Sequence, residues 1–455
     1  MVEVPVKMYL SSLLKKSRES ATPLALFSRP VKEATLRTVA ELIAERTEDL
    51  LAANREDVLA VGKSLEGEKD KDRVKAAVNR VTLAEDDIKL MADRVQRVAD
   101  LDDPVGQVIE HGERPNGMQV RRVRVPIGVL VIISELNPQT TLEILALCFK
   151  AGNVTVFRGA PEWTVTHKAL ADLLREAGER HHVPPAAITV IDRLEKDVAL
   201  ELMRATRQQI DALIVRGGAG LRKAAADTSR LPILCHDGAV NHMYIDGDVD
   251  IPMAQNLIVN SKVQQPSEPS SVDTVLVQQN IARQFLPALI RRLLDEFNVD
   301  VLGCPKTVAM IGAQPLPGYR NLIPASDGDW AKQFLAPTLS VKMVKDLDEA
   351  LAHIAQYGTG HTAVIATRDY AHAMRFVREV DAAAVLVNAS SRLHGGEEFG
   401  LGGDVGLGSS RLHARGPISL EALTTLKYVV LGTGQLRHPH PVPTAYEDAI
   451  MLKRF

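Results

Sequence analysis

Two clusters of glycines in this 455-residue sequence have the composition of ligand-binding turns. The first, RGGAG at 216–220, follows the apolar run 211–215 and opens a helical pattern. A glycine turn at a helix N-terminus exposes backbone N–H groups, which can bind a pyrophosphate or a ribose. The second, GLGGDVGLG at 400–408, predicts unusual backbone angles or close approach of a ligand, because so many glycines raise the entropic cost of folding. A tight strand-to-helix turn and a mobile surface loop remain the structural alternatives.

Cationic side chains flank the second glycine cluster. Arg392 precedes it, and His413 and Arg415 follow it. A guanidinium binds a carboxylate or a phosphate through two parallel hydrogen bonds, so these residues predict a small acidic substrate, with His413 assisting. Salt bridges that anchor a loop or an interface explain the two arginines equally well.

The composition excludes several classes of protein. A net charge of -3, without a stripe or tail rich in Lys and Arg, predicts no nucleic-acid partner. The longest apolar stretch, around 127–133, is far shorter than the roughly 20 residues of a membrane-spanning helix, so no membrane partner is expected. Three cysteines at positions 148, 235 and 304 predict neither a disulfide framework nor a metal site. With an N-terminus that lacks a signal-peptide pattern, they indicate a cytoplasmic protein.

The order of apolar runs predicts an α/β fold. After a helical first third, short β-branched runs at 153–157, 187–191 and 211–215 alternate with helical patterns. This rhythm is typical of a parallel, doubly wound sheet with helices on both faces. A second series of the same kind begins near residue 272, and the polar stretch 260–271 between the two series predicts a domain junction.

Six motifs occur in the order, and at roughly the separations, found in γ-glutamyl phosphate reductases. They are NVTVFRGAPE, IVRGGAG, QYGTGHT, VDAAAVLVNASSR, EEFGLG and LHARGP. The chain therefore resembles this family of the aldehyde dehydrogenase superfamily. The resemblance implies a nucleotide-binding domain at 1–262, with an oligomerisation hairpin at about 117–128, and a catalytic domain at 263–423. An oligomerisation strand and a tail would follow at 424–455, so a homo-oligomer is the expected assembly.

The same resemblance implies an activity and a cofactor. The family reduces γ-glutamyl phosphate to glutamate 5-semialdehyde with NADPH, a step of proline biosynthesis, and releases phosphate. Taken singly, Arg158 could merely cap a strand end and Phe399 could belong to the core. By position in the motifs, the NADPH site would be lined by Arg158, Gly159, Glu162, Gly217, Gly218 and Gly220, with Glu398 and Phe399 near the nicotinamide ribose.

The position of the family's nucleophilic cysteine holds a different residue. The segment that carries this cysteine reads NSKVQQPSEPSS at 260–271, and in register Pro269 takes its place. The thiolate would displace phosphate to form a thioester for reduction, whereas proline has neither a nucleophile nor an N–H. Asn241 likewise stands for a second cysteine, and Asn137 and Gln139 occupy substrate-binding positions where the family has Arg-Pro-Asn.

Substitute nucleophiles have weaker support. Cys235, followed by His236, would end a strand that faces the active site, but neighbouring strand residues point to opposite faces and a buried structural cysteine is the alternative. Serines 267, 270 and 271 would give an ester poorly suited to reduction. Three functions remain open: a reductase-like enzyme with altered chemistry, a non-catalytic homologue that binds dinucleotide in a regulatory or scaffolding role, and a paralogue with another substrate.

Overall fold

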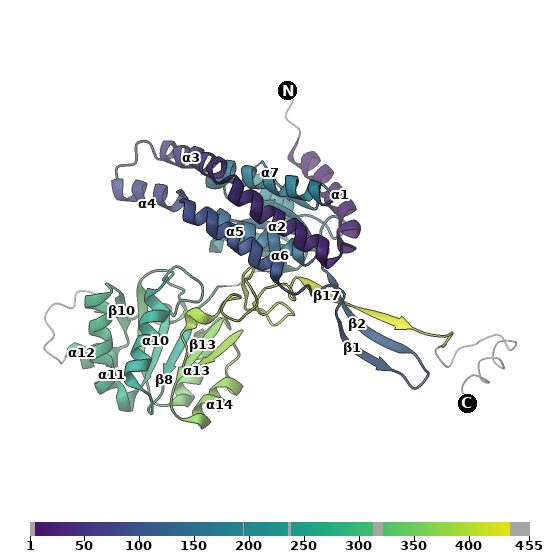
Figure 1. The fold of residues 1–455 in the computed structure, drawn as a ribbon. Coiled ribbons are helices and arrows are strands. Elements are labelled where there is room, and N and C mark those ends of the chain that lie inside the picture. The colour runs from purple at the N-terminus through teal and green to yellow at the C-terminus, as the bar shows by residue number, and fades with distance from the viewer. Residues whose placement is uncertain (1–4, 194, 235–237, 313–321, 437–455) are drawn as a thin grey trace.

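The computed structural model describes residues 5–193, 195–234, 238–312 and 322–436. Within these ranges the chain forms two α/β bodies and a three-stranded antiparallel sheet that extends away from both (Figure 1). We call the three parts the first body, the second body and the arm.

Helices dominate the chain before the first strand. The apolar residues Leu36, Val39 and Ile43 lie on α2 (Arg29–Glu45) and pack into the core of the first body. Residues 82–84 leave helical geometry, so two separate helices cover residues 71–81 and 85–100. The five helices described in this region are α1 (Val6–Ala25), α2 (Arg29–Glu45), α3 (Thr47–Ser64), α4 (Lys71–Val81) and α5 (Glu85–Asp100).

The first body contains a parallel sheet of the order β5-β4-β3-β6-β7. Its central strand β3 is buried along its whole length, so apolar side chains point to both faces and helices cover both. Its strands are β3 (Val129–Ser134), β4 (Val154–Arg158), β5 (Ile188–Val190), β6 (Ala212–Arg216) and β7 (Ile233–Leu234). The connecting helices are α6 (Pro138–Lys150), η1 (Pro161–Trp163), α7 (Thr164–Arg180), α8 (Lys196–Met203) and α9 (Ala219–Thr228).

The second body contains a parallel sheet of the order β11-β10-β12-β9-β8-β13-β14. Val275 and Val277 point into one core and Leu276 into another, as expected for a sheet covered on both faces. Its strands are β8 (His242–Ile245), β9 (Thr274–Gln278), β10 (Asp300–Gly303), β11 (Leu322–Pro324), β12 (Thr338–Val344), β13 (Thr362–Ala366) and β14 (Ala384–Val387). Its helices are α10 (Ile251–Val263), α11 (Gln279–Arg291), η2 (Arg292–Glu296), α12 (Pro305–Gly312), η3 (Asp327–Ala331), α13 (Leu347–Tyr357), α14 (Tyr370–Glu379) and η4 (Ser391–Leu393). A small ladder of β15 (Leu407–Gly408) and β16 (Gly416–Pro417) follows.

The second body begins earlier than the boundary expected at 262/263. β8 pairs with β9 and β13, so the chain has already joined the second sheet at His242. The expected boundary therefore falls inside α10, and the polar stretch 260–271 connects α10 to β9 within one body rather than joining two domains. The sequence could not reveal this, because an apolar parallel strand has the same pattern in either sheet.

The arm combines strands from distant parts of the chain. Its strands are β1 (Val108–Glu113), β2 (Gln119–Pro126) and β17 (Thr424–Leu431). β17 pairs antiparallel with β2, with Tyr428 opposite Arg122, and the Arg122 guanidinium lies 5.6 Å from the centre of the Tyr428 ring. The expected hairpin strand and late strand therefore lie side by side.

Candidate active site

Three segments meet at the amino edge of the second sheet. β9, β8 and β13 are parallel neighbours, so the residues just before each of them share one edge. These are the loop 264–273, which we call the proline loop, then Asn241 and then His361. Pro269 is half-buried within the proline loop.

Asn241 fixes the backbone of the proline loop. Its Nδ2 donates to the carbonyl oxygens of Pro269 at 2.6 Å and Ser271 at 2.7 Å. Its backbone N–H donates to Asp273 Oδ2 at 3.1 Å, and Asn241 is fully buried. Where the resembling family has a second cysteine, this chain therefore has an amide that satisfies two carbonyls on either side of Ser270.

Arg392 ties the proline loop to η4. Its Nε donates to Gln264 Oε1 at 2.7 Å, and its Nη1 contacts Ser270 Oγ. The guanidinium predicted to bind an acidic substrate is therefore beside Pro269, with two of its donors used by the loop.

Two histidines and a threonine extend this network. His361 Nδ1 lies 3.2 Å from Asn241 Oδ1 and 2.7 Å from Thr362 Oγ1, which lies 2.8 Å from His394 Nδ1. Because the Asn241 amide oxygen is an acceptor, His361 Nδ1 is the donor, and the Thr362 hydroxyl can donate to His394. Burial lowers the pKa of His394 to about 4, so its ring is neutral at pH 7. The arrangement stabilises the site without supplying a nucleophile.

A buried cation and a buried carboxylate support the same loop. Lys262 donates to the Ala336 carbonyl at 3.2 Å, and Asp273 accepts from the N–H groups of Asn241 and Phe334. Burial lowers the pKa of Lys262 to about 8, and Asp273 acts in the opposite direction. Burial raises the pKa of Asp273 to about 6, and Lys262 partly offsets this. Mutual attraction therefore favours the charged pair that burial opposes.

No thiol of the described residues lies in the proline loop. Cys148 is fully buried in α6, and burial raises its pKa to about 12, which confirms a core residue. Cys304 is buried in the core of the second body beside Thr307. Cys235, the predicted substitute nucleophile, lies outside the described residues. The Oγ of Ser271 is buried without a hydrogen-bond partner among them.

The carboxyl edge of the first sheet brings three of the residues predicted to hold the dinucleotide close to Glu135, which was not predicted. Glu135 follows β3, Arg158 ends β4, and Gly217 and Gly218 follow β6. Glu135 Oε2 accepts from the Gly218 N–H at 2.8 Å, and a Cβ at Gly217 would lie 2.3 Å from the same oxygen. Burial lowers the pKa of Arg158, while Glu135, Glu162 and Glu195 act in the opposite direction.

These residues suit a dinucleotide. A Cβ at Gly220 would meet no atom within 4 Å, so the first turn of α9 opens to free space. The carboxylate of Glu135 suits ribose hydroxyls, and Arg158 suits a phosphate. Gly159 has a different task, because a Cβ there would lie 2.4 Å from His167 Nδ1. Glu162 pairs with Arg80 at 3.4 Å.

The remaining predicted residues divide between these two edges and a third cleft. Asn137 caps α6, its Oδ1 accepting from the Thr140 N–H at 3.0 Å, and Gln139 is buried beside it. Glu398 and Phe399 are exposed, and the Phe399 ring stacks on His394 at 5.7 Å. His413 is exposed and lines a cleft of about 840 Å³ that is bordered by residues 100–102, by Arg124 of β2 and by parts of the 400–426 segment. Arg415 reaches that cleft and pairs with Asp381 at 2.6 Å.

Several residues at the two sheet edges were not predicted from the sequence. Glu135, His361, Thr362 and His394 occupy central positions in the contacts above. Glu135 had a usable signal, since it directly follows a fully buried strand. The histidine network had none, because residues 241, 361 and 394 become neighbours only when β8, β13 and η4 are in place.

Comparison with known proteins adds independent information. The model of the aldehyde dehydrogenase family matches residues 9–301 and 327–429. The chain belongs to the aldehyde dehydrogenase family. A γ-glutamyl phosphate reductase from Carboxydothermus hydrogenoformans is 41% identical over 427 residues, covering 94% of this chain and 99% of that protein. One from Salinibacter ruber is 40% identical over 430 residues, covering 94% and 95%.

A crystal structure of γ-glutamyl phosphate reductase from Thermotoga maritima superimposes with a TM-score of 0.87 at 35% identity, covering 94% of this chain and all of that one. The predicted aldehyde dehydrogenase-like α/β fold is thus confirmed, and so is the resemblance to γ-glutamyl phosphate reductases. Family membership implies a nicotinamide dinucleotide cofactor and a small-molecule substrate. In the described part of the chain, no helix is long and apolar enough to span a bilayer, and no group of His, Cys, Asp and Glu could hold a metal ion.

Proposed function

We propose that this protein binds the ligands of a γ-glutamyl phosphate reductase but lacks its covalent step at residue 269. The ligands are a nicotinamide dinucleotide at the carboxyl edge of the first sheet and a small acidic substrate near the proline loop. The observation that carries the proposal is Pro269 itself, set in a loop whose carbonyls Asn241 holds.

The covalent route needs an atom that Pro269 does not have. A thiolate would bond to the acyl carbon, phosphate would leave, and the resulting thioester would accept hydride before releasing the aldehyde. Proline supplies neither the bond to carbon nor an N–H for the oxyanion. Loss of a catalytic nucleophile costs on the order of 10⁶ in rate, so ligand binding outlasts turnover.

A second candidate is an active reductase of proline biosynthesis with altered chemistry. Its support is the likeness to proteins named γ-glutamyl phosphate reductase over nearly their whole length. This candidate requires a nucleophile from elsewhere, for which Cys235 is the sequence-based choice.

One experiment on the purified protein distinguishes the two candidate functions. NADPH binding is followed by fluorescence, and turnover is followed as NADPH formation from glutamate 5-semialdehyde, phosphate and NADP⁺. We expect binding without turnover. Turnover in the wild-type protein would disprove the proposal, and its loss in Cys235→Ser would assign the nucleophile to that residue. Absence of both binding and turnover would refute the two candidates together.

The proposed cofactor is NADP rather than NAD, as the resemblance implies. The proposal assigns the contact with the ribose phosphate to Arg158, and Glu135 and Glu162 provide negative charge beside this arginine. Titration of NADPH and NADH into wild type and Arg158→Ala tests the assignment. Arg158→Ala should reduce the affinity for NADPH by a factor at least ten times larger than the factor for NADH. Equal reductions of the two affinities would contradict a contact between Arg158 and the phosphate.

We also propose a homo-oligomer assembled through the arm, in a reducing cytoplasmic compartment. Val108, Tyr428 and Val430 leave at least half of their surface exposed on a sheet that extends away from both bodies (Figure 1). Such exposed apolar residues on a sheet favour a protein partner. Light scattering on the wild type and on Tyr428→Glu/Val430→Glu measures the assembly; a monomeric wild type would exclude it.

A further inference from the structure

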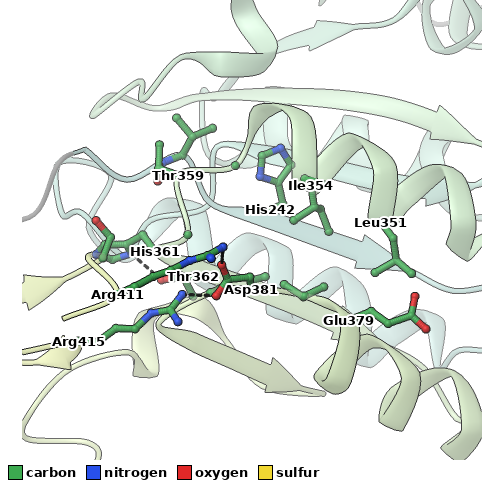
Figure 2. Close-up of a pocket in the computed structure, with 18 residues that line it drawn as sticks. His242, Leu351, Ile354, Thr359, His361, Thr362, Glu379, Asp381, Arg411 and Arg415 are labelled. Atoms are coloured by element: carbon green, nitrogen blue, oxygen red, sulfur yellow. Dashed lines mark hydrogen bonds and ion pairs between the residues drawn. The ribbon is translucent and has the colours of Figure 1, made fainter. Parts of the chain in front are cut away.

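A second cavity lies on the other side of the strand that carries Asn241. It has a volume of about 360 Å³, near the lower limit of small-ligand pockets (Figure 2). Val240 and His242 line it, whereas Asn241 between them bonds the proline loop, as alternation along a strand requires. None of its described lining residues belongs to the proline loop, and the cavity shares only His361 and Thr362 with the network that supports that loop.

The mouth of the cavity holds charges of both signs. Asp381 accepts from Arg415 at 2.6 Å and also pairs with Arg411, and Glu379 lies along the same wall (Figure 2). Glu379 also pairs with Arg375 and Arg378, so the mouth presents two guanidinium groups with the single carboxylate of Asp381 between them. Burial lowers the pKa of His242 to about 4, so this ring adds no charge at pH 7. A zwitterion finds guanidinium groups for its carboxylate and the Asp381 carboxylate for its ammonium.

The inner wall of the cavity is apolar on one side, and on the other it has buried polar atoms without hydrogen-bond partners among the described residues. Leu351, Ile354 and Ala355 of α13 face the cavity. His242 is 1% exposed, and its Nε2 has no hydrogen-bond partner among the described residues. The buried Nε of Arg415 is likewise without one among them. Unpaired buried polar atoms are costly, and a bound ligand would satisfy them.

We propose that this cavity binds a small aliphatic α-amino acid. Its carboxylate contacts Arg411 and Arg415, its ammonium contacts Asp381, and its side chain packs on Leu351 and Ile354. A basic amino acid would bury an unpaired charge, and a dinucleotide is too large for the volume.

Two contacts couple the cavity to the proline loop. His361 lines the cavity, and its Nδ1 also contacts Asn241, whose amide holds the carbonyls of Pro269 and Ser271. A second link joins the same segments, since Thr359 Oγ1 accepts from the Val240 N–H at 3.0 Å. An amino acid that orders residues 359–361 therefore slows hydrogen exchange in the proline loop.

Calorimetric titration of the full-length protein, without dinucleotide, tests the binding. The probes are L-leucine and L-proline, then leucinol, which lacks the carboxylate, 2-hydroxyisocaproate, which lacks the ammonium, and inorganic phosphate. Ala355→Trp fills the cavity from an exposed position of α13, and Ala352→Trp is its matched control on the same helix outside the lining.

We expect at least one of the two amino acids to bind the wild type and Ala352→Trp with similar affinity. The same amino acid should bind Ala355→Trp at least tenfold more weakly. Leucinol and 2-hydroxyisocaproate should each bind the wild type at least tenfold more weakly than that amino acid does. The proposal would be overturned if phosphate or leucinol bound as tightly as the amino acid, if Ala355→Trp bound the amino acid as tightly as the wild type does, or if neither amino acid bound. Hydrogen exchange in peptides covering 264–273 should slow on binding in wild type and not in Ala355→Trp; an unchanged rate in wild type would refute the coupling. None of these readouts needs reductase activity, so they stand apart from the proposed function.

Discussion

The two sheet edges that we propose to face ligands differ in what their side chains contact. The carboxyl edge of the first sheet presents glycines, an arginine and a glutamate in an open turn, as a dinucleotide site requires. The amino edge of the second sheet has Pro269 surrounded by side chains bonded to one another. Under the proposed function, the difference teaches that a fold can keep a cofactor site while the edge of the covalent step becomes structural.

The largest expected effect is a gain of activity at the amino edge. Pro269→Cys restores a thiol between carbonyls that Asn241 already positions, so turnover with glutamate 5-semialdehyde, phosphate and NADP⁺ should rise by on the order of 10² or more. The assay is NADPH absorbance under initial-rate conditions. Ser267→Cys places a thiol at an exposed position of the same loop and should gain nothing. Equal rates in Pro269→Cys and wild type would show that the contrast between the edges does not lie in the nucleophile.

The next effect is acid destabilisation concentrated in the second body. Burial lowers the pKa to about 3 for His353 and about 4 for His242 and His394, below about 6.5 in the unfolded chain. The unfolded state therefore binds more protons as the pH falls through 6.5, and stability is lost toward pH 4. From pH 7 to pH 5 the loss is about 2 kcal/mol for each histidine.

Urea unfolding at the two pH values, with hydrogen exchange to assign each transition, measures this loss. His353→Phe should reduce the pH dependence by about 2 kcal/mol, and His111→Phe, exposed on β1, should leave it unchanged. Among the described histidines of the first body, only His167 has a pKa lowered to a similar extent. The first body should therefore lose less stability than the second between pH 7 and pH 5, and an equal loss in both bodies would contradict the prediction.

A smaller effect is expected on removing the amide that orders the proline loop. Asn241→Ala leaves the carbonyls of Pro269 and Ser271 without their donor, which should lower the free energy of unfolding by roughly 2–4 kcal/mol. Ser267→Ala in the same loop should change it by less than about 0.5 kcal/mol. Urea unfolding at pH 7 compares them; similar values for the two variants would mean that the loop does not depend on Asn241.

The smallest effect separates two glycines of the carboxyl edge. Gly217→Ala forces a Cβ against Glu135 and should cost about 1–3 kcal/mol. Gly220→Ala meets no atom within 4 Å and should stabilise α9 by up to about 1 kcal/mol. Thermal unfolding measures both, and a Gly220→Ala protein that loses stability would show that the turn is closed.

Much of the fold could be predicted from local patterns. The apolar runs at 153–157 and 211–215 correspond to β4 and β6, and the glycine turn opens α9 where expected. Cys148 could be placed in the core because it lies on an apolar helical stripe. The partners of β8 could not be predicted, since pairing is decided by contacts far apart in the chain. For the same reason the sequence could not identify Asp381, which comes from another segment, as the partner of Arg415.

The pairing of β17 with β2 sets an order of events during synthesis. Arg124 and Thr424, which hydrogen-bond across this pair, are 300 positions apart. At about 5–20 residues per second, β2 would wait roughly 15–60 s on the ribosome for its neighbour. During that interval one side of β2 is an open strand edge, and the first body is completed while β17 is still to be synthesised. Chaperone protection is therefore expected to matter most between emergence of the first body and arrival of residue 431, and a chain stalled before β17 should aggregate through this edge.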